Sequence, residues 1–75
     1  MKQIKQLTCI IEREDNGYVS LCPQIDIASQ GESVEQARQN LIEAIELFFE
    51  TASPNEILTR AYSETYVTQI EVAIG

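Results

Sequence analysis

The sequence contains no histidine and no tryptophan, and only two cysteines, Cys9 and Cys22. Without histidine, the usual catalytic triads cannot be assembled. A structural zinc site normally takes four Cys or His ligands, so metal binding through imidazole or thiolate clusters is excluded as well. We therefore expect no metal, no cofactor and no disulfide framework, and we expect the two cysteines to be buried free thiols.

Basic residues are also scarce, with five Lys and Arg against twelve Asp and Glu and a net charge of −7. A nucleic-acid-binding protein needs a cationic surface that displaces counterions from phosphates, so direct nucleic-acid binding is disfavoured. The acidity is consistent with attraction to a basic partner or with ordinary solubility. Charge alone favours the second interpretation.

No apolar run approaches the roughly 20 residues that span a bilayer, and no signal peptide is apparent. These absences predict a soluble, cytoplasmic protein. A chain of 75 residues supports one domain over residues 1–75, with a small core. Because disulfides and metal are not expected, self-association is the remaining source of extra stability.

β-Forming residues dominate the first part of the chain and predict three strands at residues 4–12, 18–22 and 25–30. Asn16 and Gly17 separate the first two strands and predict a hairpin turn, because both residues tolerate positive φ. Pro23 ends the second strand, since proline has no N–H to donate.

A helix is predicted after Gly31, where Ser33 and Gln36 match a capping box. Its apolar positions recur at helical spacing and form one face: Val34, Ala37, Leu41, Ala44, Ile45 and Phe48. Ser53 and Pro54 repeat the start signal and predict a short second helix over residues 55–61.

Residues 66–74 alternate β-forming side chains and predict a fourth strand. The expected fold is therefore α/β, in the sense of α+β, with strand, strand, strand, helix, strand in order and one sheet with the helix packed on one face. The other face would carry Ile4, Ile10 and Val67, which predicts a homodimer or a higher homo-oligomer.

Residues that could carry chemistry do not form a convincing catalytic set, and we expect no enzyme. Cys22 could be a reactive thiol, but a buried apolar role is favoured. A cation could bind Glu12, Glu14 and Asp15 at the hairpin, but a solvated turn is favoured because no calcium-loop pattern is present. Phe49 is a candidate recognition residue if Phe48 belongs to the core. Two tyrosines could lie at an interface or pack at an edge: Tyr62 and Tyr66.

Five stretches in order, residues 16–19, 22–31, 33–37, 43–48 and 68–74, together resemble the compact domain of the HicB antitoxin family. The resemblance covers nearly the whole chain, and residues 53–65 are its least typical part. It implies a partial ribonuclease-H-like fold of the type β-β-β-α-β, without nuclease activity. Many family members carry a C-terminal helix-turn-helix or ribbon-helix-helix domain. The chain ends at Gly75, so we expect no DNA-binding domain.

The resemblance further implies binding to a small basic HicA-type toxin that cleaves messenger RNA. The candidate contact residues are acidic, with one aromatic: Asp15, Asp26, Glu43, Glu46 and Phe49. Two alternatives remain open at this point. One is an orphan homo-oligomeric module with a regulatory or scaffolding role, and the other is an enzyme, which would need a magnesium-binding cluster of carboxylates at the sheet.

Overall fold

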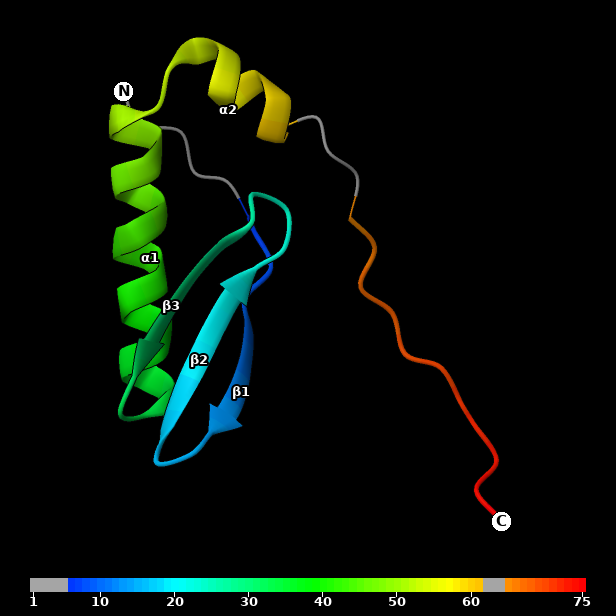
Figure 1. The fold of residues 1–75 in the computed structure, drawn as a ribbon. Coiled ribbons are helices and arrows are strands. Elements are labelled where there is room, and N and C mark those ends of the chain that lie inside the picture. Colours follow the sequence, from blue (N-terminus) through cyan, green and yellow to red (C-terminus); the bar gives the residue numbers. More distant parts are fainter. Residues whose placement is uncertain (1–5, 62–64) are drawn as a thin grey trace.

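A computed structural model describes residues 6–61 and 65–75 of the protein. Within them, a three-stranded antiparallel sheet with the order β1-β2-β3 is followed by two helices, and the longer helix covers one face of the sheet (Figure 1). The elements are β1 (Ile10–Glu14), β2 (Gly17–Cys22), β3 (Ile27–Gly31), α1 (Val34–Thr51) and α2 (Pro54–Ala61). The predicted α+β class with a helix on one face of one sheet is confirmed, and so is the short second helix.

The first strand differs from the predicted range of 4–12: residues 4 and 5 lie outside the described residues, residues 6–9 precede the strand, and β1 continues to Glu14. Ile10 pairs with Leu21 at the start of the β1–β2 ladder. Continuing this register by two residues would place Thr8 opposite Pro23, which has no N–H to donate. Instead of backbone hydrogen bonds between strands, the side chain of Gln24 bonds Thr8. Its Nε2 donates to Thr8 Oγ1 at 2.6 Å, and its Oε1 accepts from Thr8 N at 3.2 Å.

The hairpin turn lies one residue earlier than predicted. Glu14 pairs with Gly17 at the end of the ladder, so Asp15 and Asn16 form the turn. Asp15 has a φ of 53°, and no glycine has a positive φ within the described residues. Asp tolerates the left-handed region because its short polar side chain can form local hydrogen bonds. Gly17 is required for space instead: a Cβ there would lie 3.0 Å from the carbonyl oxygen of Gly31.

The predicted capping box starts α1. Ser33 Oγ accepts a hydrogen bond from Gln36 N at 3.0 Å, and the Gln36 side chain accepts one from Glu32 N at 2.6 Å. Before this cap, Gly31 brings β3 against the first turn of the helix. A Cβ on Gly31 would lie 2.5 Å from Ala37 N, which is closer than any real contact.

The core lies between α1 and the helix-facing side of the sheet. Four hydrophobic residues are buried in it, all with 3% exposure or less: Cys22, Ile25, Ala37 and Leu41. Ile25 belongs to the turn between β2 and β3, not to the third strand as predicted. The prediction of buried thiols is confirmed for Cys22 and wrong for Cys9, which is exposed outside the ladder. Phe49 also packs against this core, although helical spacing assigned Phe48 to it.

The predicted fourth strand is absent from the structure. Residues 65–75 form no strand or helix, and their apolar side chains are exposed: Tyr66 83%, Val67 60%, Ile70 81%, Val72 69% and Ile74 91%. The β-forming sequence was read correctly, but β propensity depends on neighbouring strands and is not an intrinsic backbone preference. Here no strand lies alongside the segment to complete a ladder.

Neither helix in the described parts of the chain is long and apolar enough to cross a membrane.

Candidate functional site

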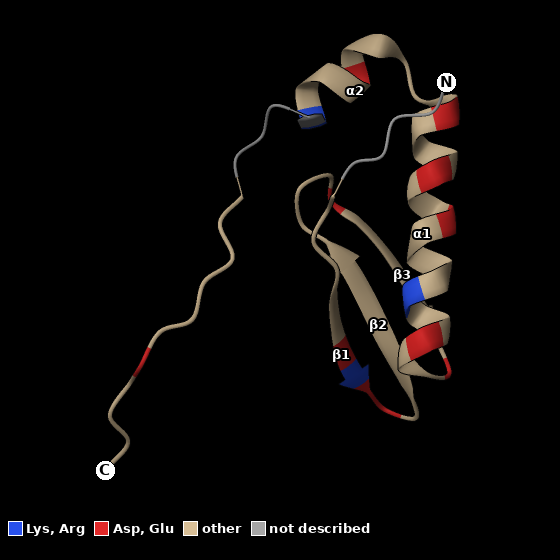
Figure 2. Ribbon diagram, turned by 180° about the vertical axis from the view of Figure 1, so that it is seen from behind, with Lys and Arg blue, Asp and Glu red and all other residues tan. Residues whose placement is uncertain are grey.

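The outer surface of α1 carries a stripe of carboxylates. Glu35, Glu43, Glu46 and Glu50 are all exposed, and at 3.6 residues per turn they fall within an arc of about 80°. Figure 2 shows acidic positions recurring along α1, with one basic position near its start. We call Glu43, Glu46 and Glu50, in the C-terminal half of the helix, the acidic stripe.

The acidic stripe forms no ion pair within residues 6–61 and 65–75. The single basic residue of α1, Arg38, lies 3.7 Å from Glu35 at the other end of the helix. The last turn of α1 contains no basic residue. Its free carbonyl groups carry the negative end of the helix dipole, so carboxylates here are unfavourable. Glu46 lies three residues after Glu43 and four before Glu50, and such like-charge pairs repel. The stripe therefore concentrates negative potential that a cationic partner would relieve.

An exposed apolar side chain borders the acidic stripe. Leu47 follows Glu43 by four residues, which places it on the adjacent turn of the same side of α1. Its exposure is 58%. The surface thus combines carboxylates with an apolar contact, as protein interfaces often do.

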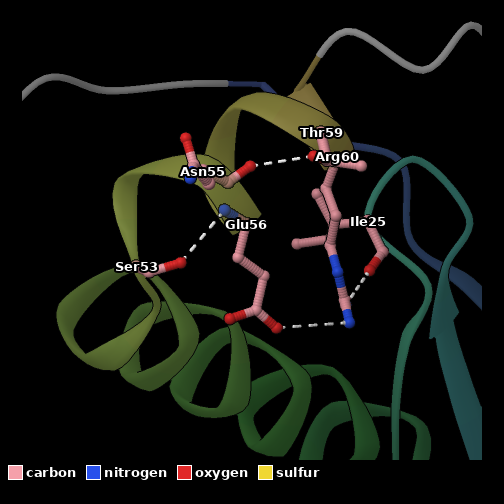
Figure 3. A network of polar contacts seen from close by, with 6 residues as sticks. All are labelled: Ile25, Ser53, Asn55, Glu56, Thr59 and Arg60. Carbon is pink, nitrogen blue, oxygen red and sulfur yellow. Dashed lines mark hydrogen bonds and ion pairs between the residues drawn. The ribbon is translucent and has the colours of Figure 1, made fainter.

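Beside the C-terminal half of α1, the second helix is held by Arg60. Its Nη1 donates to the carbonyl oxygen of Ile25 at 2.6 Å, and its Nη2 lies 3.8 Å from Glu56 (Figure 3). The guanidinium also lies 4.8 Å from the centre of the Phe48 ring. Arg60 therefore joins α2, the β2–β3 turn and α1.

At the opposite end of the sheet, an open depression lies between the β1–β2 turn and the start of α1. Its polar lining includes Glu14, Asp15, Gln30 and Asn40. Asn40 Nδ2 donates to the Gln30 carbonyl at 2.8 Å, so part of this lining is already satisfied. Among the residues that the structure describes, no three His, Cys, Asp or Glu side chains gather as they would around a metal ion.

Comparison with known proteins adds the family. A UPF0150 protein of Helicobacter pylori is 32% identical over 70 residues, which are 92% of this chain and 97% of the relative. The chain belongs to the UPF0150 family.

Two further UPF0150 proteins, both from Synechocystis, match shorter stretches. The protein ssr1765 is 46% identical over 67% of this chain, and ssl0738 is 45% identical over 60%. These matches span 66% and 65% of the two relatives, slightly less than two thirds of their length. No family model matches this UPF0150 chain, and no solved structure does.

The five predicted contact residues of this UPF0150 protein do not form one surface. Asp15 and Asp26 are exposed in turns at opposite ends of β2, and Asp26 has a φ of 54°. Glu43 and Glu46 lie together in the acidic stripe. Phe49 is half-buried and packs against the core.

Sequence reasoning missed Glu50 and Leu47 as members of the same surface. The signal for Glu50 was present, because it follows Glu46 by four residues and no Lys or Arg occupies the last turn of α1. Leu47 gave no clear signal, since a leucine in an amphipathic helix usually faces the core.

Proposed function

We propose that this UPF0150 protein is a HicB-like antitoxin that binds and neutralises a small basic HicA-type toxin that cleaves messenger RNA. The acidic stripe is the observation that carries the proposal: its three carboxylates in the C-terminal half of α1 form no ion pair within the described residues. The ordered motif resemblance to the HicB family supports it, and so does the net charge of −7. The protein acts by binding, without catalysis or turnover.

The acidic stripe could inhibit an RNA-cleaving enzyme by binding to its RNA-binding surface. Such an enzyme binds the phosphate backbone through Lys and Arg side chains, and the carboxylates of Glu43, Glu46 and Glu50 offer the same charge to those side chains. Charge complementarity speeds encounter and fixes orientation, while Leu47 supplies an apolar contact that excludes water. Occupation of the cationic surface then blocks access of RNA.

Co-purification tests this proposal. The tagged protein is isolated from its native cells at low salt, and proteins that co-elute are identified by mass spectrometry. We expect a small basic protein in near-stoichiometric amount that is released as salt is raised, because salt screens exposed charges. The released protein should cleave messenger RNA, and adding back the UPF0150 protein at equal molar amount should stop the cleavage.

Two double variants of equal charge change locate the contact. Glu43→Gln with Glu46→Gln should weaken the complex at least about tenfold, corresponding to about 1.4 kcal/mol. Glu12→Gln with Glu14→Gln removes the same charge from β1 and should leave the affinity within about threefold, the effect of net charge alone. Equal losses in both variants would assign the attraction to net charge and contradict a contact at α1.

A second candidate function is an orphan homo-oligomeric module with a regulatory or scaffolding role. The exposed apolar side chains of residues 66–74 favour it, because such a segment invites self-association. Recovery of the protein with only its own copies in the co-purification would support this candidate and remove the toxin partner.

A further inference from the structure

Residues 66–74 have the sequence of a strand but lie apart from the rest of the protein in both views (Figures 1 and 2). One side of an extended segment here would carry mostly β-branched and aromatic residues: Tyr66, Thr68, Ile70, Val72 and Ile74. The Cα radius of gyration is 14.6 Å, whereas a compact chain of this length has about 11 Å. The segment therefore leaves a large apolar area in water that a compact arrangement would bury.

β1 is an edge strand of the sheet and could accept such a segment as a new neighbour. In the order β1-β2-β3, β1 has a hydrogen-bonded neighbour on one side only within the described residues. Its other edge presents backbone N–H and C=O groups that can pair with an added strand. The sheet face away from α1 is also apolar near this edge: Ile10, Leu21 and Ala28 stand directly opposite one another across the three strands.

We propose that residues 66–74 of one copy add as a strand to the β1 edge of a second copy, and that the exchange is reciprocal. A two-fold dimer formed in this way uses the same pair of surfaces twice. Each sheet gains a fourth strand, and both exposed segments and the β1 edges of both copies become paired. Main-chain hydrogen bonds supply the affinity, as in other cases of strand addition.

The direction of the segment favours a second copy over the segment's own sheet. After α2, which Arg60 ties to the β2–β3 turn, the segment runs in the same direction as β1 (Figure 1). Addition to its own β1 would therefore be parallel. A two-fold-related copy can accept the segment in the antiparallel sense, which is the more stable pairing per residue.

The proposed dimer does not depend on the proposed toxin binding. The added strand lies at the β1 edge, whereas the acidic stripe lies on the outer surface of α1. A dimer can therefore exist with or without a toxin partner, and each idea has its own test.

The first measurement is the mass in solution by light scattering, for the wild type and for two matched variants. We expect twice the chain mass of 8.5 kDa at micromolar concentration. Ile70→Lys places a charge on the apolar side of the strand and should weaken dimerisation at least about tenfold. Gln69→Lys places the same charge on the polar side and should leave the dimer intact. Circular dichroism confirms that each variant keeps the folded sheet and helices.

A cross-link identifies which sheet receives the strand. Cys9 is exposed and precedes β1 by one residue, so a cysteine introduced at Thr68, Ile70 or Val72 in turn can approach it. After oxidation, we expect a covalent dimer on a non-reducing gel, absent from the wild type and from the same variants carrying Cys9→Ser. A disulfide within one chain would place the strand on its own sheet and overturn the proposal. A monomeric wild type, or a dimer that Ile70→Lys does not affect, would overturn it as well.

Discussion

The hydroxyl of Ser20 donates a buried hydrogen bond to the backbone carbonyl of Ala37, with 2.8 Å between the two oxygens. Ser20 is 1% exposed and Ala37 is fully buried. The bond joins the middle of β2 to α1 inside the core, where water cannot replace it. A buried polar group that keeps its partner contributes about 1 kcal/mol, and one that loses its partner costs more.

Ser20→Ala should therefore lower the free energy of unfolding by about 1 kcal/mol. Ser29 is the matched control, because it stands opposite Ser20 in the β2–β3 register and its side chain forms no hydrogen bond with the part of the chain that the structure describes. Ser29→Ala should change the stability by less than about 0.5 kcal/mol. Urea denaturation followed by circular dichroism measures both values, and equal losses would show that the Ser20 bond is not special.

Gly31→Ala should be more damaging than any other glycine substitution in the chain. The new Cβ would lie 2.5 Å from Ala37 N and 2.8 Å from Gln36 C, and both atoms belong to the backbone. Relief requires α1 to move away from β3, and such overpacking costs about 1–3 kcal/mol. Thermal unfolding measures the loss. Gly75→Ala is the control, since nothing lies within 4 Å of its added Cβ. If Gly31→Ala leaves the unfolding temperature unchanged, the close approach of β3 and α1 is refuted.

Arg60→Ala should release α2 from the rest of the fold. The guanidinium donates to the Ile25 carbonyl and lies over the Phe48 ring, so both contacts are lost together. We expect a loss of about 1–2 kcal/mol and faster amide hydrogen exchange in α2, while exchange in β2 stays slow. Arg38→Ala is the control, because the Arg38–Glu35 pair is exposed and such pairs contribute less than about 1 kcal/mol. Unchanged exchange in α2 would show that Arg60 does not hold this helix.

Helix and strand ends that are set by residues close in sequence were predictable. Pro23 ends β2, Ser33 caps α1, and Ser53 with Pro54 starts α2, because each acts on backbone groups within a few residues. The pairing register of the strands was harder to predict from the sequence. The start of β1 lies next to the contact between Gln24 and Thr8, sixteen residues apart, and no periodicity in the sequence encodes that contact.

The same distinction explains the errors in the core, the last strand and the site. Helical spacing assigned Phe48 to the core, but Phe49 packs against the buried cluster and Phe48 lies under the guanidinium of Arg60. The β pattern of residues 66–74 was visible, but a strand needs a partner that the sequence does not name. Glu43 and Glu46 share a helix face by spacing alone, whereas the separation of Asp15 from Asp26 follows from the order of the strands.

The acidic stripe should weaken the helix that carries it, and this cost can be measured. Glu50→Lys places a cation in the last turn of α1, where it favours the helix dipole and follows Glu46 by four residues. We expect a gain of about 0.5–1 kcal/mol in the free energy of unfolding. Glu35→Lys makes the same change of charge in the first turn, where it opposes the dipole and replaces a partner of Arg38, so a loss of similar size is expected.

The two variants have equal net charge, so a difference between them reports position alone. Chemical denaturation at low salt should give stability changes of opposite sign, and high salt should shrink both because the groups are exposed. If both variants are stabilised equally, relief of the overall charge of −7 is the cause and the stripe carries no local strain. If only Glu50→Lys stabilises, the C-terminal half of α1 holds carboxylates at a cost to folding. A cationic partner docking there would offset that cost.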